Sequence, residues 1–260
     1  MVFLGVTLGL IGAGGSILTV PVLVYLFSVS PSQATGYSLL IVGTTAAGGA
    51  AEYWRRKQNS PIMAAVFGIP AIAGVYVTRR YFFPAIPDSV LQLNGFILTK
   101  DVFLMIVFAV FMLVSAISMI RSKKEISLQG EHELKGINIP IIAVVGLVSG
   151  VLTGLVGAGG GFMILPILVL LGGLPIKIAI GTSLLIIAAK SLLGFIGEAQ
   201  AVASIDYRFI FTILFLPLIG IGIGAYLNGK ISSARLKPTF GYFVLVMGVY
   251  IILRELVFSQ

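Results

Sequence analysis

Two short glycine-rich stretches contain the same residues in the same order, far apart in the chain. Gly12-Ala13-Gly14-Gly15 matches Gly157-Ala158-Gly159-Gly160 at an offset of 145, and Pro21 matches Pro166 at the same offset. A helix that begins at such glycines presents unpaired N–H groups and a partial positive charge, and a small anion can approach a backbone without Cβ atoms. The alternative use of these glycines is close packing between helices. The candidate anion-binding residues are Gly14, Gly15, Ser16, Gly159, Gly160 and Gly161.

Hydroxyl side chains follow each glycine-rich stretch at matching positions. The sequence Gly36-Tyr37-Ser38-Leu39-Leu40 corresponds to Gly181-Thr182-Ser183-Leu184-Leu185. We expect Ser38, Thr182 and Ser183 to donate hydroxyl groups to the same ligand. The alternative is a hydrogen bond from each hydroxyl to a carbonyl of its own helix, which is common for Ser and Thr. The sequence leaves both interpretations open.

Three ionisable residues lie inside or near the end of apolar stretches. Lys190 is far from either end of its stretch, and its counterpart in the first half is Thr45. A lysine in hydrocarbon is costly and faces a cavity or a partner, so Lys190 is a candidate anion ligand. Its alternative is an ion pair with Glu198, about two helical turns away on the same face. Glu52 and Glu198, late in corresponding stretches, are candidates for carrying a coupling proton, with an interfacial position as the alternative.

The elements that must position these residues are membrane helices. The chain has 260 residues, of which 58% are hydrophobic and only 10% charged, with a mean hydropathy of +1.10. Long apolar blocks almost free of charge are typical of membrane-spanning helices and exclude a soluble globular enzyme. The composition predicts an all-α, polytopic membrane protein. Its eight apolar blocks are 2–27, 34–54, 62–83, 102–120, 137–173, 178–200, 207–228 and 239–257.

Signatures of soluble enzymes and of cofactor sites are missing from the sequence. There is no cysteine and one histidine, and no GxxxxGK[ST], HExxH or GxSxG motif occurs. We therefore expect no enzymatic activity, no metal site and no cofactor. The net charge of +8 does not indicate a nucleic-acid partner, because most Lys and Arg residues flank the apolar blocks, where they orient helices and meet lipid headgroups.

The duplicated pattern divides the chain into two repeat halves, 1–120 and 137–260, joined by a polar linker at 121–136. Block 137–173 is too long for one crossing, and its glycines predict two short half-helices. If blocks one and five are hairpins, eleven Lys and Arg residues share one side and five the other, whereas eight single crossings divide them nine to seven. The positive-inside rule favours the hairpins, and three crossings per half would make the two halves inverted repeats.

The duplicated pattern, seen in Gly154–Leu168 (GLVGAGGGFMILPIL) and in Gly9–Leu23, resembles the sulfite exporter TauE/SafE family of anion permeases. The segment Ile180-Gly181-Thr182-Ser183-Leu184, the chain length and the two-half layout also fit this family. The resemblance implies movement of sulfite, sulfonates or related sulfur-containing or organic anions across the cytoplasmic membrane. Tyr37 in place of Thr182, and Thr45 in place of Lys190, indicate that some ligand contacts come from one half only.

These observations predict a multi-pass secondary transporter for a small anion in the cytoplasmic membrane, working by alternating access between the two halves. The expected partners are the anion and membrane lipids, and the sequence leaves open a homo-oligomer. A passive anion channel is the first alternative, and a membrane-embedded enzyme or assembly factor the second. The sequence does not distinguish export from import and does not identify the anion or the coupling ion.

Overall fold

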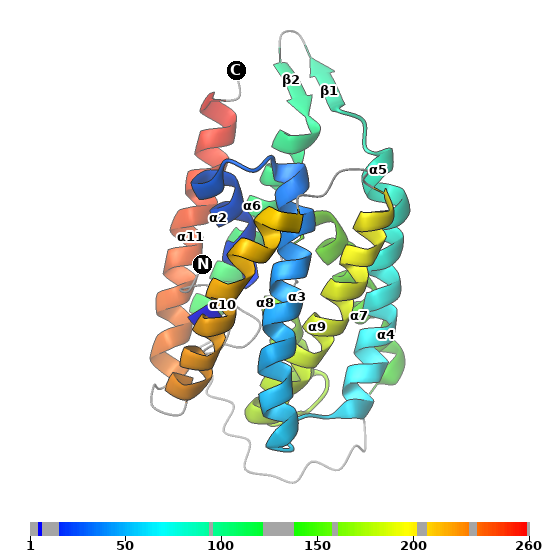
Figure 1. Cartoon of the computed structure of the whole chain (residues 1–260), viewed down its shortest axis with the longest axis vertical. Helices are drawn as coiled ribbons and strands as arrows, with labels where there is room; N and C mark the ends of the chain where they lie inside the picture. The colour runs from blue at the N-terminus through cyan, green and yellow to red at the C-terminus, as the bar shows by residue number, and fades with distance from the viewer. Residues whose placement is uncertain are drawn as a thin grey trace.

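The protein is a bundle of long helices capped at one end by a small β-hairpin (Figure 1). The computed structural model describes residues 5–6, 16–93, 96–121, 138–157, 161–201, 207–228 and 233–258. The linker residues 122–136 and the candidates Gly14, Gly15, Gly159 and Gly160 lie outside these residues. The elements are α2 (Thr19–Phe27), α3 (Pro31–Arg55), α4 (Pro61–Val77), a π-helical turn η2 (Thr78–Phe82), α5 (Phe83–Ala85), β1 (Ser89–Leu93), β2 (Phe96–Thr99), α6 (Lys100–Arg121), α7 (Ile139–Val156), α8 (Gly161–Leu170), α9 (Ile176–Ala201), α10 (Tyr207–Asn228) and α11 (Ser233–Phe258).

Prolines mark several helix starts, where a missing N–H costs nothing. Pro31 and Pro61 open α3 and α4, and the hydroxyl of Ser60 caps α4 by accepting a hydrogen bond from the Met63 N–H. The antiparallel hairpin of β1 and β2 joins α5 to α6 and was not expected from the sequence. The rest of the described chain is almost wholly helical, which confirms the all-α prediction.

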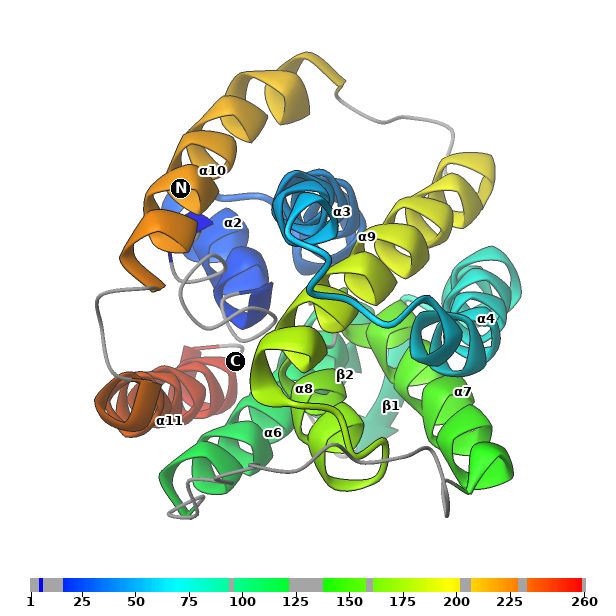
Figure 2. The ribbon, with the colours of Figure 1, turned by 90° about the horizontal axis from the view of Figure 1, so that it is seen from below.

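The helices α3 and α9 run antiparallel through the middle of the bundle, with α4 and α7 on one side and α6 and α11 on the other (Figure 2). Their direction follows from contacts at both ends. Gly36, near the start of α3, packs against the carboxyl group of Glu198 near the end of α9. Gly181, near the start of α9, packs against Tyr53 near the end of α3.

The break predicted within residues 137–173 is present, but the two parts differ in length. The helix α7 ends at Gly157, whose φ of 74° lies in the left-handed region that glycine adopts without strain. The returning helix α8 is a short segment of 10 residues, as predicted. The prediction of a short first segment is wrong, because α7 has 18 residues.

Close contact with α4 extends α7 to full length. A Cβ atom built on Gly150 would lie 2.1 Å from the carbonyl oxygen of Ala71, and one on Gly146 would lie 2.5 Å from that of Phe67. Glycines at this spacing let two helix backbones approach more closely than any side chain allows. The long contact with α4 therefore stabilises α7 along its whole length.

The bundle has an apolar outer surface and an apolar core that also contains fully buried polar and charged residues. Fully buried polar residues include Ser38, Arg79, Thr182 and Lys190. Large apolar side chains such as Ile69, Val144 and Phe215 are exposed on the outer helix faces. Among the described residues, four helical segments are long and apolar enough to cross a membrane: Pro61–Ala85, Lys100–Ile117, Ile139–Val156 and Lys177–Gln200. The prediction of a polytopic helical membrane protein is confirmed.

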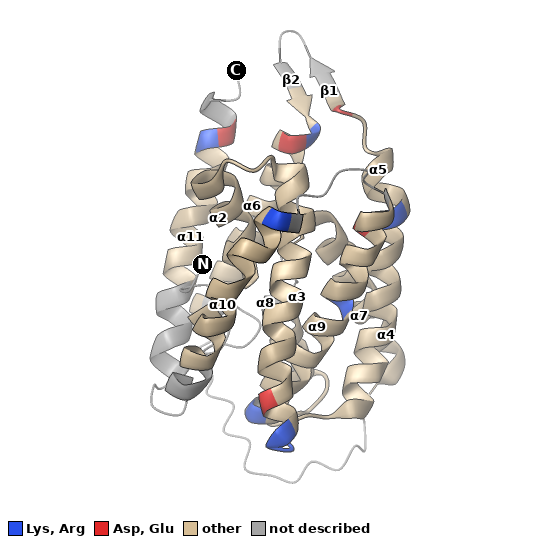
Figure 3. Ribbon diagram, in the orientation of Figure 1, with Lys and Arg blue, Asp and Glu red and all other residues tan. Residues whose placement is uncertain are grey.

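Most of the described Lys and Arg residues lie toward the two ends of the bundle (Figure 3), whereas Lys190 lies near the middle of α9. The end of α3 and the start of α9 lie together, which places Lys57 and Lys177 at the same end. The opposite end includes Lys100 and Arg208, at the starts of α6 and α10. This grouping is the one expected if the segment ending in α8 enters and returns, since eight single crossings would separate Lys57 from Lys177.

Candidate functional site

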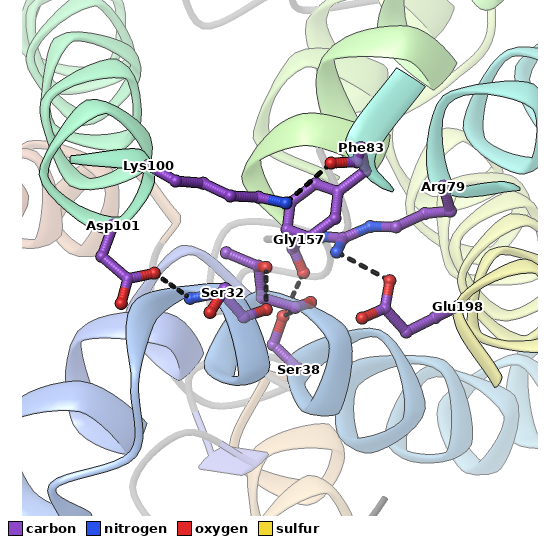
Figure 4. Close-up of polar contacts among 9 residues, drawn as sticks. Ser32, Ser38, Arg79, Phe83, Lys100, Asp101, Gly157 and Glu198 are labelled. Carbon is purple, nitrogen blue, oxygen red and sulfur yellow. Dashed lines mark hydrogen bonds and ion pairs between the residues drawn. The ribbon is translucent and has the colours of Figure 1, made fainter. Parts of the chain in front are cut away.

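A buried ion pair joins the two halves of the protein (Figure 4). Nη1 of Arg79, on the turn η2, donates a hydrogen bond to Oε2 of Glu198 on α9 at 3.1 Å. The side chain of Arg79 is 0% exposed and that of Glu198 is 7% exposed. Such a pair is costly to desolvate, and removing one partner leaves a buried charge without compensation. The location of this ion pair therefore says more about the function of the protein than its contribution to stability does.

The face of Arg79 is covered by an aromatic ring that also contacts a second cation. Cζ of Arg79 lies 4.2 Å from the centroid of the Phe83 ring, and Nζ of Lys100 lies 4.4 Å from the same centroid. Nζ of Lys100 also donates a hydrogen bond to the carbonyl oxygen of Phe83 at 2.8 Å. The quadrupole of the Phe83 ring attracts each of these cations, so the ring holds both of them close to the ion pair.

The start of α3 connects this ion pair to the glycine break. The hydroxyl of Ser38 donates both to the carbonyl oxygen of Gly157 and to that of Thr35, the latter at 2.8 Å (Figure 4). Gly157 packs against the backbone of Thr35, where an added Cβ would lie 2.3 Å from the carbonyl oxygen. The next residue, Gly36, contacts Glu198. Ser38 therefore makes the bond within its own helix that was the alternative interpretation, and it also bonds to Gly157 of the opposite half; its contact with a ligand stays a prediction.

Lys190 lies in a separate buried cluster between α9 and α7. Its Nζ donates to Oγ1 of Thr153 at 2.9 Å and to Oγ of Ser149 at 3.5 Å. The alternative ion pair between Lys190 and Glu198 is wrong, because the carboxylate of Glu198 pairs with Arg79 instead. In the described residues the contacts of Lys190 are hydroxyl groups, so its ammonium group faces no carboxylate there.

The hydroxyls of Thr182 and Ser183 both bond to their own helix. Thr182 donates to the carbonyl oxygen of Ile178 at 2.7 Å and accepts the N–H of Ser60 at 2.9 Å, which fixes the loop before α4. Ser183 donates to the carbonyl oxygen of Ile180 at 2.8 Å. Thr182 and Ser183 are fully buried. They lie toward the other end of the bundle from Ser38, so the three hydroxyls do not converge on one point in this conformation.

The remaining predicted residues lie in different surroundings. Ser16 is fully buried just before α2, and Gly161 is the first residue of α8. Glu52 forms an ion pair with Arg56 at 2.7 Å near the end of α3, with 40% of its side chain exposed. Glu198 is buried instead. At the offset of 145 the counterpart of Glu198 is Tyr53, so the two carboxylates are not equivalent.

The contacts between α3 and α9 include symmetric pairs. In each pair, a residue of one half contacts a residue of the other, and the counterparts of these two residues are also in contact. Gly36 contacts Glu198, while Gly181 contacts Tyr53, and each residue of the first pair has its counterpart in the second at the offset of 145. A second symmetric pair of contacts follows the same pattern. Gly49 contacts Leu184 and Gly194 contacts Leu39. Matching residues thus meet across the centre of the bundle.

Arg79 is the residue that sequence reasoning missed. Its position beside Arg80 at the end of an apolar block indicates a flanking surface charge, but its side chain has no exposed surface. Its position inside block 62–83 is the only local indication of burial. Its partner Glu198 is 119 residues away, and neither residue indicates the other.

The apolar outer surface and the four helical segments long enough to cross a membrane define a polytopic helical membrane protein. The family described as "Sulfite exporter TauE/SafE" matches residues 1–251, and the chain belongs to this family. A "Probable membrane transporter protein" of Xylella fastidiosa (strain 9a5c) is 26% identical over 96% of this chain and 92% of its own length. "Probable membrane transporter protein YunE" of Bacillus subtilis (strain 168) is 26% identical over 97% of this chain and 94% of its own length. No solved structure matches the chain.

Proposed function

We propose that this protein is a secondary transporter that moves a small anion, such as sulfite or a sulfonate, across the cytoplasmic membrane. The observation that carries the proposal is the placement of two short helices. The helix α2 ends just before the start of α3, and α8 ends just before the start of α9. Since α3 and α9 start at opposite ends of the bundle, α2 and α8 begin inside it and point outward in opposite directions.

The lengths support an internal position for both helix N-termini. The 9 residues of α2 and the 10 of α8 rise about 14–15 Å each, against about 38 Å for the 25 residues of α3. Transporters with discontinuous helices place such N-termini near the middle of the bilayer, where the N–H groups and the helix dipole stabilise an anion. We assign this role to the residues around Ser16 and Gly161, supported by Ser38, Thr182, Ser183 and Lys190.

The symmetric contacts support a mechanism in which the halves are inverted repeats. A two-fold axis in the membrane plane would make α3 and α9 antiparallel and would bring matching residues of the two helices into contact, as is found here. The contact of Gly36 with Glu198 closes one end, and that of Gly181 with Tyr53 closes the other. In alternating access one of these contacts opens while the other stays closed.

Uptake of radiolabelled sulfite into proteoliposomes of the purified protein tests this function. Saturable uptake that an imposed pH gradient increases is the expected result for a coupled carrier. It would also make Glu198 the stronger candidate for the coupling proton, because Glu52 is partly exposed beside Arg56. Uptake that rises linearly with concentration would indicate a passive channel. No uptake of sulfite, sulfonates or thiosulfate would contradict the assignment of the substrate class.

A further inference from the structure

Arg79 has two donor nitrogens without an acceptor among the described residues. Nη1 bonds to Glu198, whereas Nε and Nη2 are buried and have no hydrogen-bond partner in that part of the chain. The hydroxyl of the adjacent Thr78 is also buried without a partner there. Buried unsatisfied donors cost free energy, and a charged group costs more than a neutral one. These unpaired donors therefore indicate the chemistry of the ligand that the site binds.

The two free nitrogens form one edge of the guanidinium group. In arginine the Nε–H bond and one N–H bond of Nη2 are parallel and lie on the side away from Cδ, so they form a two-pronged donor. This edge matches two oxygens of a carboxylate, sulfonate or sulfite group, which accept the two hydrogen bonds together. A halide ion has a single centre, so it cannot place a separate acceptor atom in line with each of the two N–H bonds.

The backbone around Arg79 is unusual in a second way. Residues Thr78–Phe82 form a π-helical turn within an otherwise regular α-helical segment. Such turns are rare and are found mostly at functional sites, where the extra residue changes the direction of a side chain. The turn directs Arg79 toward α9, and the contacts of Glu198 with Gly36 and of Gly157 with Thr35 place it beside the break between α7 and α8.

We propose that Arg79 binds the transported oxyanion through Nε–H and Nη2–H, while Nη1 keeps its bond to Glu198. The proposal rests on the proposed function and names a ligand-binding residue for it. It also names the substrate class, which is an anion with at least two terminal oxygens. Because the edge is enclosed in this conformation, the anion reaches it only when the helices packed around η2 move, while the bond between Nη1 of Arg79 and Glu198 stays in place.

Equilibrium binding of radiolabelled sulfite to the purified protein in detergent tests the proposal. Methanesulfonate and acetate should compete with sulfite, and an equal concentration of chloride should not. In Arg79→Lys, which keeps the charge but loses the two-pronged edge, we expect the dissociation constant to rise by about tenfold or more. Arg80→Lys is the matched control, because Arg80 is adjacent but partly exposed, and it bonds to the carbonyl oxygen of Gln200 rather than to Glu198. It should stay within about twofold of the wild type.

The variant Glu198→Gln separates binding from a purely structural role. The amide keeps an acceptor for Nη1 but removes a negative charge beside the anion, so sulfite should bind several-fold more tightly. If Arg79→Lys fails to fold, as judged by gel filtration and thermal unfolding, Glu198→Gln alone carries the test. Unchanged or weaker binding in Glu198→Gln, or equal effects of the two Arg→Lys variants, would overturn the proposal. So would failure of every oxyanion to bind the wild-type protein.

The same variants in proteoliposomes keep this proposal distinct from the proposed function. If the wild type transports sulfite and Arg79→Lys keeps the same half-saturation concentration, the function stands and the role of Arg79 is wrong. If the wild type binds oxyanions through Arg79 but no flux occurs, the binding site stands and the transporter assignment is wrong.

Discussion

Arg79 and Lys190 are both long cations with no exposed surface, yet their surroundings differ in kind. Arg79 faces a carboxylate from the other half, whereas Lys190 faces the hydroxyls of Ser149 and Thr153 on α7. A buried ammonium group that contacts only hydroxyls is poorly compensated. An anion that passes along α9 would supply the missing charge, which makes Lys190 a candidate for a second binding position.

Replacing Lys190 by Met tests this role, because Met fills a similar volume without charge. We expect transport to fall about tenfold or more while folded protein still reaches the membrane, since a buried group interacting with a charge contributes more than 1.4 kcal/mol. Uptake assays and the amount of folded protein after purification measure the two quantities. Lys177→Met, an exposed lysine at the start of the same helix, is the control. Transport kinetics unchanged in Lys190→Met would remove this residue from the site.

At the scale of the helices, the contact between α4 and α7 depends on the absence of side chains. A Cβ atom on Gly150 would lie 2.1 Å from the carbonyl oxygen of Ala71, a backbone atom that cannot rotate away. Gly5 in the first half, the counterpart of Gly150, packs in the same way against the backbone of Pro217 in α10. These contacts hold the outer helices to one another in both halves.

The variant Gly150→Ala should therefore destabilise the protein, although alanine is the better helix former. Separating the two backbones should cost about 1–3 kcal/mol, which outweighs a gain of up to about 1 kcal/mol in helix propensity. The midpoint of thermal unfolding in detergent should fall. Gly222→Ala in α10 is the matched control, because an added Cβ there has nothing within 4 Å, and its midpoint should stay equal or rise. An equal midpoint for Gly150→Ala and the wild type would contradict the close contact.

Sequence reasoning predicted those helical features that depend on local composition and failed where distant residues meet. The break at Gly157 follows from consecutive glycines, and the burial of Lys190 follows from the length of its apolar block. The full length of α7 could not be predicted, because it depends on packing against α4. Neither could the partners of Glu198 and Lys190, since Thr153 and Arg79 become neighbours of α9 only after the helices associate.

At the scale of the whole molecule, the distribution of cations predicts an orientation. Lys57 and Lys177 lie at one end and Arg208 at the other. The hairpin arrangement puts eleven of the Lys and Arg residues of the sequence on the side of Lys57 and Lys177, so this end should face the cytoplasm. The chain has no cysteine, so single cysteines can be introduced without background labelling.

Labelling with a membrane-impermeant maleimide in vesicles of known orientation measures this arrangement. We expect Lys57→Cys and Lys177→Cys to react from the cytoplasmic side and Arg208→Cys from the opposite side. Reaction of Lys57→Cys and Lys177→Cys from opposite sides would contradict both the hairpin made by α7 with α8 and the proposed inversion. All three variants should retain uptake, because these residues lie at the ends of the bundle, away from the ion pair.

The symmetric contacts across α3 and α9 do not make the two halves interchangeable. Two copies of residues 1–120 would place Tyr53 where Glu198 now lies, and would lack Lys190 altogether. Two copies of residues 137–260 would lack Arg79, whose counterpart is Gly224. Neither half can rebuild the charged centre with a second copy of itself. A dimer of either half alone would therefore lack part of the buried charged cluster that the single chain contains.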